Sequence, residues 1–308
     1  MYSFVIPVFN EQESLPILYG RMCDLIALLD APAEIILIND GSTDHSARLM
    51  TDIVDTDPRF RLIEFSRNFG HQIAITAGLD YADGDAVIIM DADLQDPPEV
   101  VLRMVAAWRQ GAEVVYGVRL QRDGDSFLKK LTASFFYRIL TRISKIKIPN
   151  DTGDFRLVDR KAVLAFRSMR EHKRYVRGMF SWVGFRQVSV SYVRHARTAG
   201  ATKFSWLKMF SFAVDGIFGF SSAPARLIGY AGFACTTAGF LVTAVGVGEF
   251  GNPESATTGR MFVPGLVVLF GGFQLMAIGI LGRYLTRIYE ETRARPLYVL
   301  NSIKGFSR

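Results

Sequence analysis

Two long stretches without a charged residue constrain the fold of this 308-residue chain more than any other feature of its sequence. They run from Leu227 to Gly248 and from Met261 to Gly282. Each has the roughly 20 residues that a helix needs to cross the hydrocarbon core of a bilayer. Helices of soluble proteins normally keep one polar face over such a length. The pattern predicts two transmembrane helices within residues 226–285, with a pair of buried helices as the alternative.

The charges around these stretches predict how the chain lies in a membrane. The connection Glu249–Arg260 is short and nearly neutral, whereas residues 286–308 form a basic tail. Because basic flanking segments stay in the cytoplasm, both termini are expected on the cytoplasmic side. We expect no cleavable signal peptide, since Met1 leads directly into a short strand-like run without a basic segment or a long apolar core.

Two segments that precede the spans are expected to lie at the membrane surface. Residues 126–147 place apolar side chains at spacings of three and four among many basic ones, which predicts a basic amphipathic helix. A helix packed on its own domain is the alternative. Residues 203–220 are rich in Phe and Trp, which suit the headgroup level, so we interpret residues 201–225 as interfacial. Attraction to anionic lipid is assigned to Arg138, Arg142, Lys145 and Lys147.

The first two hundred residues alternate between short β-branched runs and helical patterns. Such alternation predicts an α/β domain with a doubly wound, mostly parallel sheet over residues 1–200. Ligands of such sheets bind beyond the carboxyl ends of the strands, so the residues after each run are the candidates for chemistry. No G-x-G-x-x-G follows the first run, which argues against a dinucleotide-dependent dehydrogenase. The expected strands are residues 3–9, 34–40, 61–66, 86–93 and 113–119, and the expected helices are residues 15–29, 44 onward, 71–81 and 97–108.

Composition excludes several other classes of protein. The chain is 49% hydrophobic with a net charge of +6, which argues against a disordered tail or a fibrous repeat. Its two cysteines, Cys23 and Cys235, supply neither a disulfide framework nor a cysteine zinc site, and they indicate a reducing compartment for the main domain. His71 and His195 show no zinc spacing either. A structural role is favoured for both, although His71 is also a candidate for lining a nucleotide pocket.

The segment DADLQD, Asp91 to Asp96, carries the sharpest chemical signal. If the strand continues through it, Asp91 and Asp93 point to the same side, and Gln95 can follow them. Carboxylate and amide oxygens suit Mg²⁺ or Mn²⁺ bridged to a diphosphate. Acidic residues at strand ends often cap the next helix, but Asp96 before two prolines fits that role and leaves the other two free. We therefore predict a metal site on Asp91, Asp93 and Gln95.

Asp40 in the segment NDGS allows two interpretations. Its carboxylate could accept a hydrogen bond from a base N–H of a nucleotide. Alternatively, Asp-Gly followed by Ser and Thr is ordinary turn and helix-capping chemistry. Spacing alone favours the turn.

The segments PVFNE, NDGSTD, DADLQDPPE and TGDFRL occur together over residues 4–205 in the order and spacing of glycosyltransferase family 2. With two C-terminal spans, the chain resembles the polyprenyl-phosphate glycosyltransferases, which include dolichol-phosphate mannosyltransferases and bactoprenol glucosyltransferases. The resemblance implies a GT-A fold that moves a sugar, with inversion, from a nucleotide diphosphate to the phosphate of a membrane polyprenol. A UDP-sugar is favoured over GDP-mannose as the donor, and Mg²⁺ or Mn²⁺ is the expected cofactor.

The same resemblance implies where the enzyme works and with what. We expect a nucleotide-sugar donor, a polyprenyl phosphate acceptor and a lipid bilayer as partners, and no nucleic acid; a homo-oligomer stays open. The implied location is the bacterial inner membrane, in cell-envelope glycosylation with a cytoplasmic catalytic domain.

The resemblance also assigns roles to individual residues. Asp154 of TGDFRL matches the acidic residue usually assigned as the catalytic base, and Asp93 is assigned to catalysis as well as to the metal. A phosphate monoester is already mostly dianionic at pH 7, so Asp154 either acts as a base or orients the acceptor and stabilises developing positive charge. The residues implied for the nucleotide are Pro7, Asn10, Glu11, Asp40 and Asp91. Those implied for the acceptor phosphate are Arg119, Lys130, Ser134, Arg177, Arg197 and Lys203.

Two other functions remain as alternatives at this point. One is a glycosyltransferase acting on another lipid, such as diacylglycerol or ceramide. The other is a membrane channel or transporter component with a nucleotide-sensing domain, which the lack of ionisable residues inside the spans disfavours. Residues 174–184 lack the Q-x-x-R-W signature of processive family members, so a single transfer is favoured over polymerisation.

Overall fold

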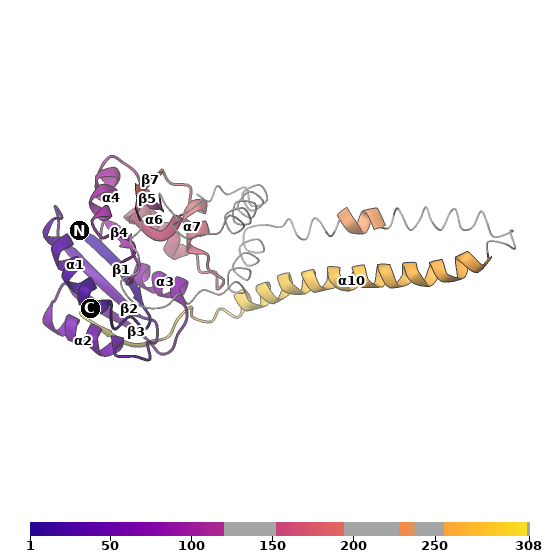
Figure 1. The fold of residues 1–308 in the computed structure, drawn as a ribbon, viewed down its shortest axis with the longest axis horizontal. Coiled ribbons are helices and arrows are strands. Elements are labelled where there is room, and N and C mark those ends of the chain that lie inside the picture. The colour runs from indigo at the N-terminus through magenta and orange to yellow at the C-terminus, as the bar shows by residue number, and fades with distance from the viewer. Residues whose placement is uncertain (120–151, 194–227, 229, 236, 238–255, 307–308) are drawn as a thin grey trace. The chain divides into compact units, whose positions relative to one another are not determined.

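The computed structural model describes residues 1–119, 152–193, 228, 230–235, 237 and 256–306 (Figure 1). The chain divides into two compact units. Unit 1 comprises Met1–Phe212 and Pro296–Arg308, and unit 2 comprises Ala213–Arg295.

The described part of unit 1 is built around one mixed sheet of eight strands. These are β1 (Tyr2–Val8), β2 (Ala33–Asn39), β3 (Phe60–Phe65), β4 (Ala86–Ile89), β5 (Val114–Arg119), β6 (Thr152–Asp159), β7 (Gln187–Tyr192) and β8 (Leu300–Lys304). They lie in the order β7-β5-β6-β4-β1-β2-β3-β8. The pairs β1–β2, β1–β4, β2–β3 and β5–β7 are parallel, whereas β6 and β8 pair antiparallel with their neighbours. The predicted α/β domain with a mostly parallel sheet is confirmed.

Helices cover both faces of this sheet. They are α1 (Leu15–Ala27), α2 (Ser46–Thr56), α3 (His71–Tyr81), α4 (Val100–Arg109), α6 (Arg160–Ser168) and α7 (Val176–Trp182). Phe4 and Ile6 of β1 are buried in a core shared with α1 and α4. Val5 faces the opposite side, where Gly78 of α3 lies against it, because successive strand residues alternate between faces. A strand buried on both faces has to be almost wholly apolar, as β1 is.

The expected elements of the first 119 residues are present with small shifts at their ends, and α3 has the predicted bounds. One difference bears on the site: β4 ends at Ile89, although the sequence predicts a strand up to Asp93. The apolar residues of β4 are buried between β1 and β6, and the polar segment after them leaves the sheet in a turn, with Leu94 at a φ of +55°. The antiparallel strands β6 and β8 were not expected, and β8 lies within the predicted basic tail.

Unit 2 contains one long described helix, α10 (Ala256–Thr292), which includes the second predicted span. Apolar side chains on it are exposed, among them Leu275, Ile278, Leu281 and Leu285. Within the described residues, no helix is long and apolar enough to cross a membrane. The first predicted span lies mostly outside the described residues, and the interfacial segments 126–147 and 201–225 lie wholly outside them.

Candidate active site

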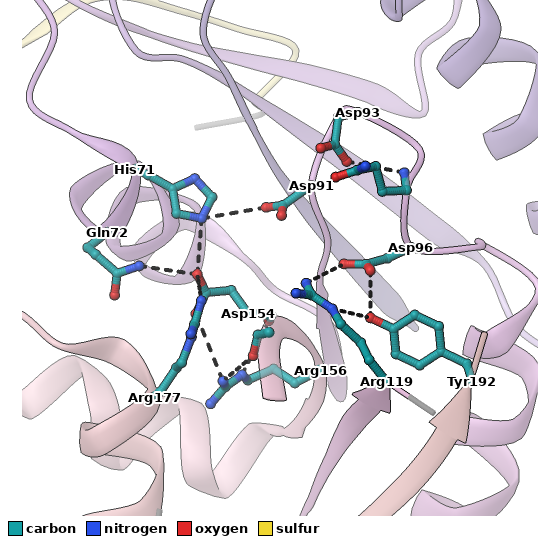
Figure 2. A network of polar contacts seen from close by, with 12 residues as sticks. His71, Gln72, Asp91, Asp93, Asp96, Arg119, Asp154, Arg156, Arg177 and Tyr192 are labelled. Carbon is teal, nitrogen blue, oxygen red and sulfur yellow. Dashed lines mark hydrogen bonds and ion pairs between the residues drawn. The ribbon is translucent and has the colours of Figure 1, made fainter. Parts of the chain in front are cut away.

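Charged and polar side chains gather at the carboxyl edge of the parallel strands (Figure 2). They come from the turn after β4, the first turn of α3, the ends of β5 and β7, the start of β6 and the start of α7. The register of the sheet explains why the start of β6 lies beside the turn after β4, because Ile89 of β4 pairs with Arg156 of antiparallel β6. Asp154, two residues before Arg156, is thereby brought level with the turn that follows β4.

Asp154 is the centre of the cluster and is 5% exposed. Arg177 donates to it from Nε at 2.7 Å and from Nη2 at 3.2 Å, and Gln72 Nε2 donates at 3.3 Å. His71 Nε2 lies 3.2 Å from Asp154 Oδ2. Burial alone would raise the pKa of Asp154, but the charge of Arg177 and the hydrogen bonds from His71 and Arg177 hold it well below its ordinary value. Asp154 is therefore a carboxylate at neutral pH and a weak proton acceptor.

His71 joins the two acidic motifs. Its Nε2 lies between Asp154 and Asp91, 3.5 Å from Asp91 Oδ1 (Figure 2). Desolvation favours the neutral imidazole, but the hydrogen bond to Asp154 and the charges of both carboxylates raise the pKa of His71 to about 9. The imidazole is accordingly a cation at neutral pH. Its position beside both motifs places His71 in the cluster, and a role in lining a nucleotide pocket stays a prediction.

The acidic turn differs from the sequence-based expectation. Because β4 ends at Ile89, Asp91 and Asp93 do not lie in a strand. The prediction that strand alternation points both side chains to the same side is therefore wrong. The Asp91 carboxyl is turned toward His71, whereas Asp93 Oδ1 accepts a hydrogen bond from the backbone N–H of Gln95 at 3.2 Å (Figure 2). Asp93 is 8% exposed.

The chemistry of this turn nevertheless fits a hard divalent cation. Burial and the nearby carboxylates, Asp154, Asp96 and Asp93, raise the pKa of Asp91 to about 6, although His71 opposes the shift. Asp91 Oδ1 is buried without a hydrogen-bond donor. A cation would relieve this concentration of negative charge. The described residues do not gather three or more Asp, Glu, His or Cys ligands into a preformed metal centre, so further ligands would have to come from a bound diphosphate.

Asp96 does not cap α4 as expected, because Glu99 occupies the N-cap position. Its carboxylate instead accepts a hydrogen bond from Tyr192 Oη at 2.5 Å and lies 3.7 Å from Nη2 of Arg119. Asp96 thus connects the acidic turn with the ends of β5 and β7.

The segments PVFNE and NDGSTD are joined by hydrogen bonds. Asn10 follows β1 with a φ of +55°, and its Oδ1 accepts a hydrogen bond from Thr43 N at 2.8 Å. The Asp40 carboxylate accepts hydrogen bonds from the backbone N–H groups of Phe69, at 2.7 Å, and Gly70. Burial raises the pKa of Asp40, and these two donors partly oppose the shift. Asp40 therefore joins the NDGS turn to the loop before α3. Pro7 lies within β1, and Glu11 follows Asn10 and accepts a hydrogen bond from Ser14.

The remaining predicted residues lie outside the described part of the chain. These are Lys130, Ser134, Arg197 and Lys203, and the lipid-attracting residues of segment 126–147. Of the predicted acceptor-phosphate residues, Arg119 and Arg177 are described, and both lie in the cluster.

Three residues of the cluster were missed by the sequence analysis. Gln72 donates to Asp154 and accepts from Val176 N at 2.9 Å, so it also fixes the start of α7. Arg156 is 4% exposed and donates to the backbone oxygens of Gly153 and Asp154; burial lowers its pKa to about 10. Gln72 follows the candidate residue His71, and Arg156 lies within the segment TGDFRL, so sequence position was a signal for both. Tyr192 had no local signal.

Comparison with known proteins identifies the family of the chain. A family model described as Glycosyl transferase family 2 matches residues 3–165. The chain is 44% identical over 304 residues to the uncharacterized glycosyltransferase YkcC of Bacillus subtilis (strain 168), covering 99% of this chain and 94% of the relative. It is 40% identical over 305 residues to the bactoprenol glucosyl transferase of Shigella phage SfX, covering 98% and 99% of the two chains.

A solved structure supports the fold. Glucosyl-3-phosphoglycerate synthase from Mycobacterium tuberculosis, in complex with Mn²⁺, uridine diphosphate and phosphoglyceric acid, has a TM-score of 0.50 at 17% identity, covering 71% of this chain and 76% of that chain. The fold is accordingly an α/β fold of the GT-A type. Because the family model matches more than half of its length and glycosyltransferases at 40% and 44% identity align almost end to end, the chain belongs to glycosyl transferase family 2.

Proposed function

We propose that this enzyme transfers a hexose, with inversion, from a UDP-sugar to the phosphate of a membrane polyprenol. The observation that carries the proposal is the similarity of nearly the whole chain to bactoprenol glucosyl transferases, at 40% identity for that of Shigella phage SfX and 39% for that of Shigella phage SfV. Glucose is the sugar that these relatives' names favour.

In this proposal the donor binds at the carboxyl ends of β1, β2 and β4. The residues that would hold the nucleotide are Pro7, Asn10, Glu11, Asp40 and Asp91. Asp91, Asp93 and Gln95 would hold Mg²⁺ or Mn²⁺, which when bound neutralises charge on the leaving diphosphate. The raised pKa of Asp91 supports this assignment, because it reflects burial and, after it, the negative charge of the neighbouring carboxylates, which His71 offsets only in part.

The acceptor phosphate attacks the anomeric carbon through one of its oxygens, and the bond from that carbon to the diphosphate breaks. The phosphate is mostly dianionic at pH 7, so no proton has to be removed. The difficulty is repulsion between two anionic substrates and the carboxylates of the site. Arg119 and Arg177 offset that repulsion with guanidinium groups, which suit phosphate oxygens.

Asp154 in this scheme orients Arg177 and stabilises positive charge that develops at the anomeric carbon. Its lowered pKa supports this role over that of a general base. A hydroxyl acceptor, such as diacylglycerol, would require a base, so the same observation disfavours transfer to such a lipid.

A transfer assay tests the proposal. Purified full-length protein in detergent with Mn²⁺ and radiolabelled UDP-glucose is given undecaprenyl phosphate, undecaprenol or diacylglycerol. We expect lipid-extractable label with undecaprenyl phosphate alone, and a much lower rate with GDP-mannose as donor. Label on diacylglycerol, or no transfer to any of the three lipids, would contradict the proposal.

The proposal includes anchoring by two spans, residues 227–248 and 261–282, with the catalytic domain in the cytoplasm. The exposed apolar side chains of α10 support a lipid environment for that helix. Strand β8 adds a second argument, because it follows both predicted spans in sequence and pairs with β3 in the sheet that contains β1. A chain whose two ends belong to one sheet must cross the bilayer an even number of times between them.

Protease protection on sealed vesicles checks this arrangement. Epitope tags placed before residue 1 and after residue 308 are expected to be digested from the same side of the membrane. A C-terminal tag on the opposite side from the N-terminal tag would mean one span rather than two, and it would also separate β8 from β3.

A further inference from the structure

A buried tyrosine connects the acidic turn with a predicted phosphate-binding arginine. Tyr192, 2% exposed, donates from its hydroxyl to Asp96 Oδ1 at 2.5 Å (Figure 2). The same hydroxyl accepts a hydrogen bond from Arg119 Nε at 3.3 Å, and Arg119 Nη2 lies 3.7 Å from Asp96 Oδ2. Asp96 is 1% exposed. The three side chains therefore form a closed triangle at the edge of the site.

Two glycines lie close to this triangle. Arg119 and Tyr192 are the last residues of β5 and β7 and are partners in the register of these parallel strands. A Cβ atom on Gly117 would lie 2.7 Å from the Tyr192 ring, and one on Gly153 would lie 2.6 Å from Arg119 Nη2. The guanidinium thus rests against the residue that precedes Asp154. A side chain at Gly117 would displace the Tyr192 ring, and one at Gly153 would displace the end of the Arg119 side chain.

We propose that Tyr192 is a positioning residue for the acceptor: directly and together with Asp96, it holds the Arg119 guanidinium where the phosphate of the polyprenyl phosphate binds. This inference rests on the proposed function and adds a specific residue to it. An arginine side chain has several rotatable bonds, and immobilising it only when the ligand arrives weakens binding. A hydroxyl and a carboxylate that hold it beforehand remove that cost.

The chain contains a matched control for this constellation. Tyr2, 1% exposed at the start of β1, donates to Asp30 Oδ1 at 2.6 Å and accepts from Arg109 Nη2 at 3.2 Å, and Arg109 lies 3.1 Å from Asp30. The same three residue types are thus linked in a triangle, with the difference that the side chains of Arg109 and Asp30 are exposed. Tyr2 is the first residue of β1, whereas the site lies at the carboxyl ends of the strands. The Tyr2 hydroxyl is therefore at the opposite edge of the sheet from the proposed acceptor site.

The test compares Tyr192→Phe with Tyr2→Phe in the full-length protein, because each variant loses one hydroxyl and keeps its ring. Initial rates are measured in detergent over a series of undecaprenyl phosphate concentrations and, separately, of UDP-glucose concentrations. Tyr192→Phe is expected to raise the acceptor KM about tenfold, which corresponds to about 1.4 kcal/mol, and to change the donor KM less than twofold. Tyr2→Phe should leave both KM values unchanged. A merely structural role would lower kcat and melting temperature in both variants without separating the two KM values.

A second comparison asks whether Tyr192 acts through Arg119. In an Arg119→Ala background, the additional Tyr192→Phe change is expected to have no further effect on the acceptor KM, because its target is gone. The inference would be overturned if the two substitutions raised the acceptor KM independently, so that their factors multiplied in the double variant. It would also be overturned if Tyr192→Phe alone left the acceptor KM unchanged. If Tyr192→Phe does not fold, Asp96→Asn takes its place with the same expectation. Failure of the wild type to use undecaprenyl phosphate would instead contradict the proposed function.

Discussion

Asp154→Asn is expected to lower kcat by about 10²- to 10³-fold, the loss typical of removing one preorganised group that stabilises charge in a transition state. The substitution keeps the shape of the side chain and its hydrogen bonds with Arg177 and Gln72 in part, but it removes the negative charge in the middle of the cluster. The measurement is kcat at saturating donor and acceptor. KM for the donor is expected to change much less than kcat.

Asp159→Asn is the control for this variant. Asp159 ends β6, the strand that carries Asp154, and its carboxylate caps α6 and accepts a hydrogen bond from Trp108. An asparagine can still cap the helix, so activity should stay near that of the wild type. Equal losses in the two variants would show that charge at Asp154 has no special role.

The pH profile separates the two roles of Asp154. Its pKa lies well below the ordinary value, so it stays ionised throughout the neutral range and protonates only in strong acid. If it acts by its charge, Asp154→Asn lowers the rate by the same factor from pH 6 to pH 8 and leaves the shape of the profile unchanged. Loss of an acid limb in the variant would identify Asp154 as a base instead.

Removal of divalent metal is expected to abolish transfer. EDTA should reduce the rate to background, and excess Mn²⁺ should restore it. Asp91→Ala and Asp93→Ala should each remove activity in Mn²⁺ or Mg²⁺ while the melting temperature stays near that of the wild type. Asp55→Ala, at an exposed carboxylate that pairs with Lys304, is the control and should retain activity. Full turnover in EDTA would contradict the metal role.

Metal binding itself should depend on pH through Asp91. Its pKa is raised to about 6, so the carboxylate is mostly ionised at pH 7 and mostly protonated at pH 5. Because only the ionised form binds metal, the affinity for Mn²⁺ in the presence of UDP should fall as the pH drops through 6. Calorimetric titration at pH 5, 6 and 7 measures this. An affinity that does not change over this range would exclude Asp91 as a ligand.

Local patterns in the sequence determined much of the catalytic domain. The alternation of β-branched runs with helical periods predicted the parallel strands β1 to β4 and the helices between them, because burial on both faces of a sheet leaves a continuous apolar run. The same reasoning predicted the candidate site, since residues that follow parallel strands meet at one edge. Asp40 and Asp91 were singled out in this way, whereas Arg119 was assigned through the resemblance to the family.

Other features depend on contacts between distant parts of the chain. The turn after Ile89 and the antiparallel course of β6 bring Asp154 to His71, 83 residues earlier. Tyr192 meets Asp96 across 96 residues, and β8 returns to β3 from beyond residue 299. A hydrophobic period reports only which face of a segment is buried. How all the segments pack together decides which strand lies beside it and which side chains then form hydrogen bonds and ion pairs. The partners of Asp154 and the contacts of Tyr192 were therefore visible only in the tertiary structure.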